Sequence, residues 1–339
     1  MAAEAYVTFV MRNDAFIPGA LVFAYALKRQ KTTRDLLCMI TEDVSKQGMD
    51  TLREVFDDVF RIDEWFVKHE ARHERQDRPF LFTRFQALRL GHDGDMGKGY
   101  DKILVADADV LPLEDYDALF SLPAPAGIIN EKKHYCMEYD DAGNYVIPPT
   151  VYTHKTWKWH AVYRDIPFGT TIPKSITDRV INDHDNMGMN AALYLFEPSM
   201  TLYQSIVKDT LNASVASMIA KWPWPEMQYI TWKLSGQWHN MDLRYASFNG
   251  YPSIDALKGI HFAGLKPWRH RHRSVPHFAK KEDYRLWYAV FQAMLKDYPI
   301  LRKDPKLLKL NAFIDDVVKT KDLVFRRKHL PNIKHLFEH

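Results

Sequence analysis

The sequence predicts an α/β fold built on a mostly parallel, doubly wound sheet. Apolar, β-prone runs alternate with runs of helical spacing through the first third of the chain, an order typical of this class. Residues Lys102–Ala106 read KILVA, a continuous apolar run of the kind that forms a buried parallel strand. The chain has 339 residues, 46% of them hydrophobic, which suffices for one large domain with a small appendage.

Each element follows from local pattern. The expected strands are Ala5–Met11, Leu36–Thr41, Asp58–Ile62, Lys102–Ala106 and Ala191–Phe196. The expected helices are Gly19–Arg29, Gly48–Phe56, Thr83–Leu90, Ser199–Lys208, Tyr229–Leu234, Tyr284–Leu295 and Pro305–Val318. Either Asn13 or Asp14 can cap the first helix, and the sequence leaves both open.

The pattern divides the chain into a main domain, residues 1–275, and a helical C-terminal extension, residues 276–339. Inside the domain, the periodicity disappears over about 131–185, which is long for a loop in a compact fold and indicates a lid or a substrate wall. Trp157 and Trp159 of this insertion are candidates for stacking on a ligand, although plain packing explains exposed aromatics as well. The C-terminal extension can cap the domain or mediate a homodimer.

Composition excludes several classes of protein. The net charge is only +3, so the basic runs at 268–273 and 326–328 are expected to be solvated faces rather than a nucleic-acid surface. The two cysteines cannot form a disulfide framework, and His270 with His272 lacks the partners of a zinc site. The chain begins without a basic leader and has no apolar run long enough for a transmembrane segment, from which we expect a cytoplasmic protein.

Two carboxylates follow directly on the KILVA strand, in the sequence Asp107-Ala108-Asp109. Ligands of open α/β sheets bind beyond the carboxyl ends of the strands, so this Asp-x-Asp motif lies where a ligand is expected. Hard oxygen ligands suit Mg²⁺ or Mn²⁺, which commonly bridge to substrate phosphates. The same tripeptide is also frequent in solvated turns, and the preceding strand is what favours a metal site here.

A second cluster of chemistry-bearing residues runs from His261 to Trp268, HFAGLKPW. His261 can complete a metal sphere begun by carboxylates, although a packed loop histidine is the alternative. Gly264 permits close backbone approach to a diphosphate, and Lys266 can neutralise phosphate charge. Together they indicate a phosphate-binding loop.

These motifs occur in an order that is more specific than any one of them. The ordered pieces are Tyr6 to Thr8, Asn13 to Phe16, Gly19 to Val22, Thr83 to Phe85, Tyr100 to Lys102, Asp107 to Asp109, Asn190 to Ala192, Phe196 to Ser199 and His261 to Trp268. With them the sequence resembles the glycogenin-like glycosyltransferases of family 8, which have a single GT-A domain. The resemblance covers about Tyr6 to Trp268, interrupted by the insertion.

The resemblance implies a metal-dependent transfer from a UDP-sugar. Asp107, Asp109 and His261 match the family's Mn²⁺ ligands, with Mg²⁺ as a second possibility, and Gly264 and Lys266 match its diphosphate contacts. The resemblance further implies contacts with the uracil, ribose and sugar of the donor. The matching residues are Phe9, Val10, Asn13 and Phe16 at the uracil, Ala108 at the ribose, Arg84 in place of a lysine at the sugar or phosphate, and Asn190 at the sugar hydroxyls.

One departure from the family concerns the reacting carbon. The acid-glutamine pair that the family holds near the anomeric carbon stands here as Met227-Gln228, with Glu226 immediately before it. The resemblance implies that Gln228, Asn190 and Glu226 line the catalytic site of a retaining hexosyltransferase acting on a carbohydrate or protein acceptor.

Two other functions are compatible with the sequence. Met227 and Ala192 favour a catalytically weak UDP-sugar-binding or scaffold protein. A self-glycosylating, glycogenin-like primer would need an acceptor tyrosine, for which Tyr229, Tyr245 and Tyr251 are the candidates, although packing tyrosines are the plainer interpretation.

Overall fold

The computed structural model describes residues 3–70, 78–129, 138–139, 145–146, 166–184, 186–248, 254, 257–269, 282–318 and 335–337. The insertion predicted at 131–185 therefore lies largely outside the described residues, together with Trp157, Trp159 and Tyr251. The same holds for the basic runs beyond Arg269 and at 326–328, and for His270 and His272.

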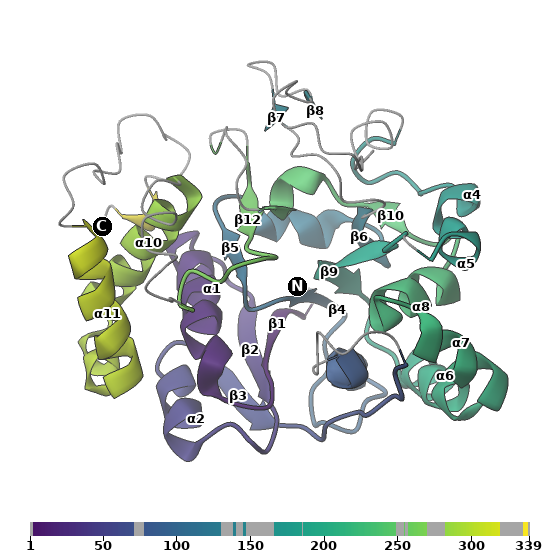
Figure 1. Cartoon of the computed structure of the whole chain (residues 1–339), viewed down its shortest axis with the longest axis horizontal. Helices are drawn as coiled ribbons and strands as arrows, with labels where there is room; N and C mark the ends of the chain where they lie inside the picture. Colours follow the sequence, from purple (N-terminus) through teal and green to yellow (C-terminus); the bar gives the residue numbers. More distant parts are fainter. Residues whose placement is uncertain are drawn as a thin grey trace.

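A seven-stranded sheet in the order β10-β6-β9-β4-β1-β2-β3 forms the centre of the molecule (Figure 1). Its strands are β1 Glu4–Val10, β2 Asp35–Ile40, β3 Asp58–Arg61, β4 Lys102–Ala106, β6 Ala126–Ile129, β9 Met189–Phe196 and β10 His239–Asn240. Strands β4, β1, β2 and β3 run parallel to one another, whereas β9 is antiparallel to both β4 and β6. The predicted α/β class with a mostly parallel sheet is confirmed, and the expected strands recur within one or two residues of their predicted limits.

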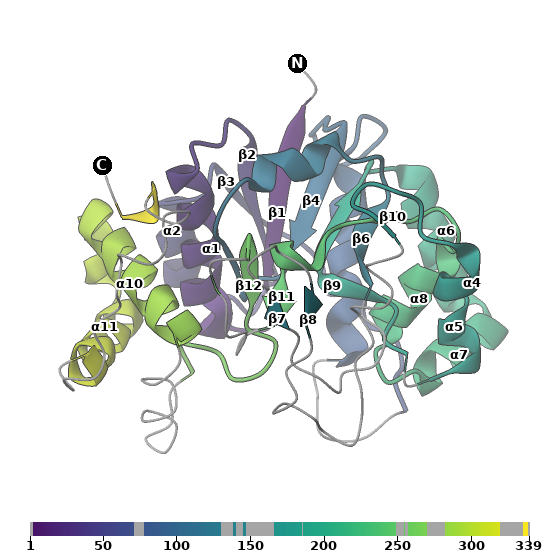
Figure 2. The ribbon, with the colours of Figure 1, turned by 90° about the horizontal axis from the view of Figure 1, so that it is seen from above.

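A smaller sheet, which the local sequence pattern does not predict, lies at the carboxyl end of β4. It consists of β5 Val110–Pro112, β11 Ser247–Phe248 and β12 Gly259–His261, in the order β11-β12-β5. A further strand pair joins β7 Glu138–Tyr139 and β8 Tyr145–Val146. Figure 2 shows the small sheet where the β4 arrow ends.

Helices flank the central sheet at both ends of the molecule. They are α1 Ile17–Arg29, α2 Lys46–Arg53, α4 Lys174–Thr177, α5 Arg179–Asn182, α6 Met200–Leu211, α7 Ala213–Lys221, α8 Pro225–Lys233, α10 Glu282–Asp297 and α11 Pro305–Val318. In both views α10 and α11 lie beside α1 and α2, whereas α4 to α8 gather at the opposite end (Figures 1 and 2). The segment predicted to be helical at Thr83–Leu90 belongs to a longer 3₁₀ helix, Arg78–Leu90.

The start of α1 resolves the capping question. The Asn13 side chain accepts a hydrogen bond from the Ala15 amide, 2.8 Å away, and so caps the 3₁₀ turn Asp14–Phe16 that leads into the helix. Asp14 instead accepts hydrogen bonds from the amide and hydroxyl of Ser45 at 2.8 and 2.7 Å. Asn13 therefore shapes the entry to α1, while Asp14 ties it to the start of α2.

The C-terminal helices are joined to the N-terminal half by specific contacts. The Tyr25 hydroxyl of α1 donates to Asp297 at the end of α10, 2.7 Å away. The Thr51 hydroxyl of α2 donates to Asp304, 3.1 Å away in the interior. The extension predicted at 276–339 thus packs on α1 and α2. No helix in the described part of the chain combines the length and apolar character that crossing a bilayer requires.

Candidate functional site

The Asp107–Asp109 turn lies between β4 and β5 and is held by backbone hydrogen bonds on both sides. The Asp107 amide donates to the Ala192 carbonyl of β9, and the Val110 amide donates back to the Asp107 carbonyl, each at 3.1 Å. The Thr8 hydroxyl of β1 donates to the Ala106 carbonyl at 2.9 Å. These bonds fix the turn at the carboxyl edge of the sheet, where the sequence predicts a ligand.

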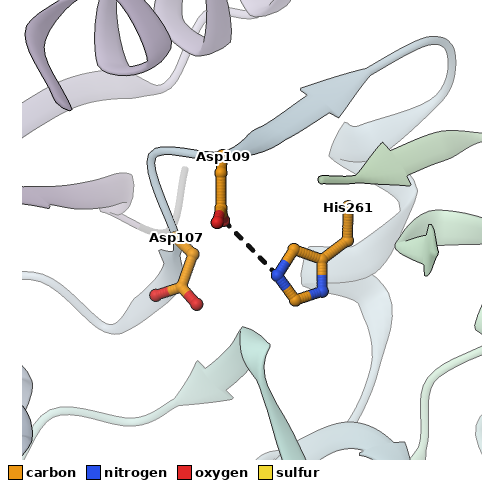
Figure 3. A group of neighbouring side chains, drawn as sticks. All are labelled: Asp107, Asp109 and His261. Carbon is orange, nitrogen blue, oxygen red and sulfur yellow. Dashed lines mark ion pairs between the residues drawn. The ribbon is translucent and has the colours of Figure 1, made fainter. Parts of the chain in front are cut away.

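Strand pairing brings His261 to Asp109. In the antiparallel pair β5–β12, His261 lies opposite Val110, and the Phe262 amide donates to the Asp109 carbonyl at 2.9 Å. The His261 Nε2 atom is consequently 3.4 Å from Asp109 Oδ1. Figure 3 marks this ion pair with a dashed line. One ligand atom from each of Asp107, Asp109 and His261 lies within 4.8 Å of the others, so the three predicted metal ligands form one cluster.

The donor atoms of this cluster fit a divalent cation. Two carboxylates suit hard divalent cations such as Mn²⁺ or Mg²⁺, and an imidazole can complete the coordination sphere. Asp109 is only 7% exposed, and its Oδ1 atom lies 3.4 Å from His261 Nε2 but accepts no well-formed hydrogen bond from the described residues. A buried carboxylate oxygen in this position is stabilised when a cation approaches it. The residues present therefore fit a metal ion.

Lys266 lies against the same carboxylate. Its Nζ atom donates to Asp109 Oδ2 and to the Phe262 carbonyl, the latter at 2.6 Å. Burial by itself would raise the pKa of Asp109, but the positive charges of Lys266 and His261 outweigh this effect and hold the pKa below its ordinary range. Asp109 is therefore ionised at neutral pH and is shared between the metal cluster and the lysine.

Arg84 pairs with the other carboxylate. Its guanidinium lies 3.1 Å from Asp107 Oδ1 and donates to the Ala191 carbonyl at 2.9 Å. Burial raises the pKa of Asp107, and the attraction of Arg84 only partly offsets this. Burial would lower the pKa of Arg84, but the negative charges of Asp107 and Glu226 raise it, so the guanidinium stays charged. The buried Nε–H of Arg84 has no hydrogen-bond partner among the described side chains and backbone, which leaves a donor for a ligand.

Asn190 and Glu226 lie close to this arginine network. Asn190 of β9 is 2% exposed, and its side-chain oxygen accepts from the Ala192 amide at 3.0 Å. Its buried Nδ2 atom finds no acceptor in the described part of the chain. Glu226, in the first turn of α8, is 3% exposed and acts electrostatically on both Arg84 and Tyr194. A buried amide and a buried carboxylate thus lie on the β9 side of the cluster.

Gln228 has a different environment. Its amide nitrogen donates to the carbonyls of His184 and Asn186 at 3.1 and 2.9 Å, and its oxygen accepts from the Trp224 amide at 2.9 Å. All of these partners are backbone groups, and the side chain is fully buried. Gln228 therefore fixes the backbone on either side of residue 185 to the start of α8.

The residues predicted to hold a uracil divide into two groups. Phe9 and Val10 are buried in the core at the end of β1, whereas Asn13 is exposed and Phe16 is partly buried. The Phe16 ring contacts Trp268 edge to face at 5.7 Å and lies 6.0 Å from Lys266 Nζ. Phe16 thus lies next to the Lys266 loop, whereas Phe9 and Val10 belong to the hydrophobic core.

Gly264 and Ala108 also lie at this edge. A side chain built on Gly264 would meet no atom of the described residues within 4 Å, so these residues leave space for a ligand over it. Ala108 is 5% exposed, and its carbonyl approaches Gly19 of α1 so closely that a methyl group there would lie 2.3 Å from it. Trp268 would meet the same methyl group at 2.3 Å. The sequence pattern does not mark Gly19 as a position where only a glycine fits.

Comparison with known proteins identifies relatives of the chain. No family model matches. An uncharacterised protein of Acanthamoeba polyphaga mimivirus, R707, is 25% identical over 88% of this chain and 97% of its own length. Human glycogenin-2 is 31% identical over 47% of this chain and 30% of its own length. Galactinol synthase 4 of Arabidopsis thaliana is 23% identical over 87% of this chain and 83% of its own length.

The homologues of this chain are glycogenins and galactinol synthases. Both belong to glycosyltransferase family 8, as the motif order predicted. Among solved structures, the bifunctional glycosyltransferase WbbM aligns with a TM-score of 0.53 at 13% identity, over 92% of this chain and 51% of WbbM, which supports the GT-A fold. The chain therefore spans about half of that protein and, in the glycogenin match, less than a third of glycogenin-2.

In this glycogenin-like chain the Lys266–Asp109 pair leads to a prediction. Because Lys266 neutralises a metal ligand, we expect Lys266→Met to strengthen the binding of Mn²⁺ alone by about tenfold, the worth of a charged, largely buried hydrogen bond. The same variant should bind UDP more weakly, because it loses a positive charge for the diphosphate.

Titration of free Mn²⁺ by electron paramagnetic resonance measures the first effect. Lys258→Met is the matched control, because Lys258 pairs with exposed Asp115 at 2.9 Å just before β12. Unchanged or weaker Mn²⁺ binding by Lys266→Met would show that the lysine does not compete for Asp109.

Proposed function

We propose that the protein is a retaining glycosyltransferase that moves a hexosyl unit from a UDP-sugar to a carbohydrate or protein acceptor with Mn²⁺. The observation that carries the proposal is the cluster of Asp107, Asp109 and His261 with Lys266 beside it, on a GT-A fold. The homologues support a glycosyltransferase.

In this proposal the chain's residues act on the two ends of the donor. Asp107, Asp109 and His261 would hold the ion, which supplies positive charge to the departing diphosphate when bound. Lys266 leaves Asp109 for a phosphate oxygen, so its charge stabilises the leaving group as negative charge develops there. Gly264 leaves room for the diphosphate against the loop backbone.

Arg84, Asn190 and Glu226 act at the sugar. The Nε–H of Arg84 and the Nδ2 of Asn190 are buried donors for which the described residues offer no acceptor, and donors of this kind are satisfied when a ligand oxygen approaches them. Glu226 supplies negative charge beside the positive charge that forms on the sugar ring in the transition state. Gln228 contributes by holding the carbonyls of His184 and Asn186 in place, because its side-chain amide is already used in these hydrogen bonds.

The test is a panel of UDP-sugars incubated with the native protein and Mn²⁺ in the presence of candidate acceptors. We expect one donor to be consumed, with activity lost on chelation of the metal. Proton NMR of the product measures the anomeric configuration, and we expect retention. An inverted anomer would refute the retaining mechanism. Tight Mn²⁺-dependent UDP binding with no turnover of any donor would instead favour a binding or scaffold role.

Self-glycosylation receives little support from the described tyrosines. Tyr229 is fully buried, and its hydroxyl donates to Asp209 at 2.8 Å. Tyr245 is 3% exposed and stacks on Phe168 with ring centroids 6.0 Å apart. Neither hydroxyl is available as an acceptor without local opening, so we propose transfer to a separate acceptor. Homodimerisation and a cytoplasmic location remain proposals that rest on the sequence alone.

A further inference from the structure

One face of α10 makes hydrogen bonds and ring contacts with the loop that carries Lys266. Tyr284, Trp287 and Tyr288 follow the helical spacing that places side chains on one face. The Tyr284 hydroxyl donates to the Leu265 carbonyl at 2.6 Å, and the Tyr288 hydroxyl donates to the Pro267 carbonyl at 3.0 Å. Trp287 packs on Trp268 with ring centroids 5.3 Å apart. The helix therefore contacts the backbone on both sides of Lys266.

These hydroxyls act as donors in a dry environment. Tyr284 and Tyr288 are each 1% exposed. Burial raises the pKa of both above the ordinary value for tyrosine, so both stay protonated at neutral pH. The Tyr288–Pro267 bond is buried, and a buried carbonyl that loses its donor costs more than the bond itself contributes. The Tyr284–Leu265 bond is part-buried and adds the contribution of one hydrogen bond to the present path of the loop.

Other contacts also hold this loop among the described residues, such as the Lys266–Asp109 bond and the Phe16–Trp268 ring contact, and these are made by side chains. Leu265 is 53% exposed, so its side chain does not anchor the turn in the core. A side chain built on Gly264 would meet none of the described residues within 4 Å. The Lys266 carbonyl accepts from the Arg269 amide at 3.0 Å, which closes a local turn. In the described part of the chain, α10 therefore supplies the bonds that tie the carbonyls of residues 265 and 267 to another element.

The helix itself is fixed independently of the loop. At its far end, Asp297 accepts the Tyr25 hydroxyl of α1 and lies 3.6 Å from Arg29. The Tyr25 and Tyr298 rings also meet edge to face at 6.2 Å. The first turn of α1 lies beside the Asp107–Asp109 turn, because Gly19 approaches the Ala108 carbonyl. The helix pair α1–α10 therefore connects the loop to the candidate metal cluster.

We propose that Tyr284 and Tyr288 are positioning residues for donor binding, which aim Lys266 at the diphosphate by fixing the backbone of Leu265 and Pro267. This inference rests on the proposed function and extends it, because it makes the C-terminal extension part of the donor site. The ligand chemistry is that of a nucleoside diphosphate, since a monophosphate lacks the second phosphate that Lys266 would neutralise.

The experiment compares UDP with UMP, both in the presence of Mn²⁺, by isothermal titration calorimetry on the full chain. We expect the double variant Tyr284→Phe with Tyr288→Phe to bind UDP about tenfold more weakly, and each single variant about threefold, from the loss of one hydrogen bond each. UMP affinity should change less than twofold. Phenylalanine keeps the ring contacts of both residues, including the 5.2 Å edge contact of Tyr284 with Phe262.

Tyr25→Phe is the matched control, because it removes one buried tyrosine hydroxyl bond at the other end of α10. It should lower the thermal unfolding midpoint as the single variants do, yet keep the preference for UDP over UMP. If the variants at 284 and 288 keep the wild-type preference for UDP over UMP, the inference is overturned but the proposed function is not. A wild-type protein that binds neither nucleotide with Mn²⁺ would overturn the proposed function, and the inference with it.

Discussion

We expect Asp109→Asn to abolish metal-dependent turnover of the donor, with a loss of about a thousandfold or more. A bound divalent ion contributes several kcal/mol of charge stabilisation to a leaving diphosphate, and about 4 kcal/mol corresponds to this factor. Asp109 is the carboxylate that His261 and Lys266 both approach, so its charge cannot be replaced by a neighbour at the same position. Asparagine keeps the shape and removes only the charge.

The measurement is donor consumption at saturating Mn²⁺, together with Mn²⁺ binding by electron paramagnetic resonance. Asp50→Asn is the matched control, because Asp50 is exposed on α2 and pairs only loosely with Arg53 at 3.4 Å. Circular dichroism at the assay temperature shows whether Asp109→Asn remains folded after Lys266 loses its partner. Mn²⁺-dependent turnover that survives in a folded Asp109→Asn protein would contradict the assignment of the metal site.

Gly19→Ala is expected to lower the free energy of unfolding by about 2–3 kcal/mol, the cost of inserting a methyl group into a filled interior. The new methyl carbon would lie 2.3 Å from the Ala108 carbonyl oxygen and 2.3 Å from the Trp268 ring. Backbone and a buried indole cannot yield as the tip of a flexible side chain does. Helix α1 would have to move away from the metal-binding turn, so UDP binding with Mn²⁺ should weaken as well.

Thermal unfolding followed by circular dichroism measures the stability effect, which amounts to several degrees in the midpoint. Gly264→Ala serves as the stability control, because a methyl group at this position meets no atom within 4 Å. The two variants should therefore differ in unfolding midpoint although both add one methyl group to a glycine. Equal midpoints would mean that α1 can shift at no cost.

The departure at Met227-Gln228 illustrates that a sequence position does not define the surroundings of a side chain. Matching by order placed the family's acid-glutamine pair on these two residues. In the structure Glu226 is the residue of α8 that acts on Arg84, and Gln228 bonds to the backbone of His184 and Asn186. Side chains two residues apart on a helix point in different directions, so a shift of one or two positions decides which of them faces the cluster.

The sequence by itself determined the local elements. The apolar run Lys102–Ala106 predicted β4, and Asp107 and Asp109 were placed correctly at its carboxyl end. The cluster predicted from Asp107, Asp109 and His261 forms in the structure. These predictions succeed because apolar runs and helical spacing are local signals, and because the order of motifs within a family constrains which residues meet.

Only the tertiary structure decided what lies between distant segments. It set the antiparallel direction of β9 and formed the small sheet that aligns His261 with Asp109. It also brought Lys266 to an aspartate 157 residues away and α10 to the Lys266 loop. A strand's direction and partner depend on the pairing of both edges and on the path of its connections, which local periodicity does not encode. Gly19 shows the same limit, because its need for space arises from Ala108 and Trp268, which only folding brings to α1.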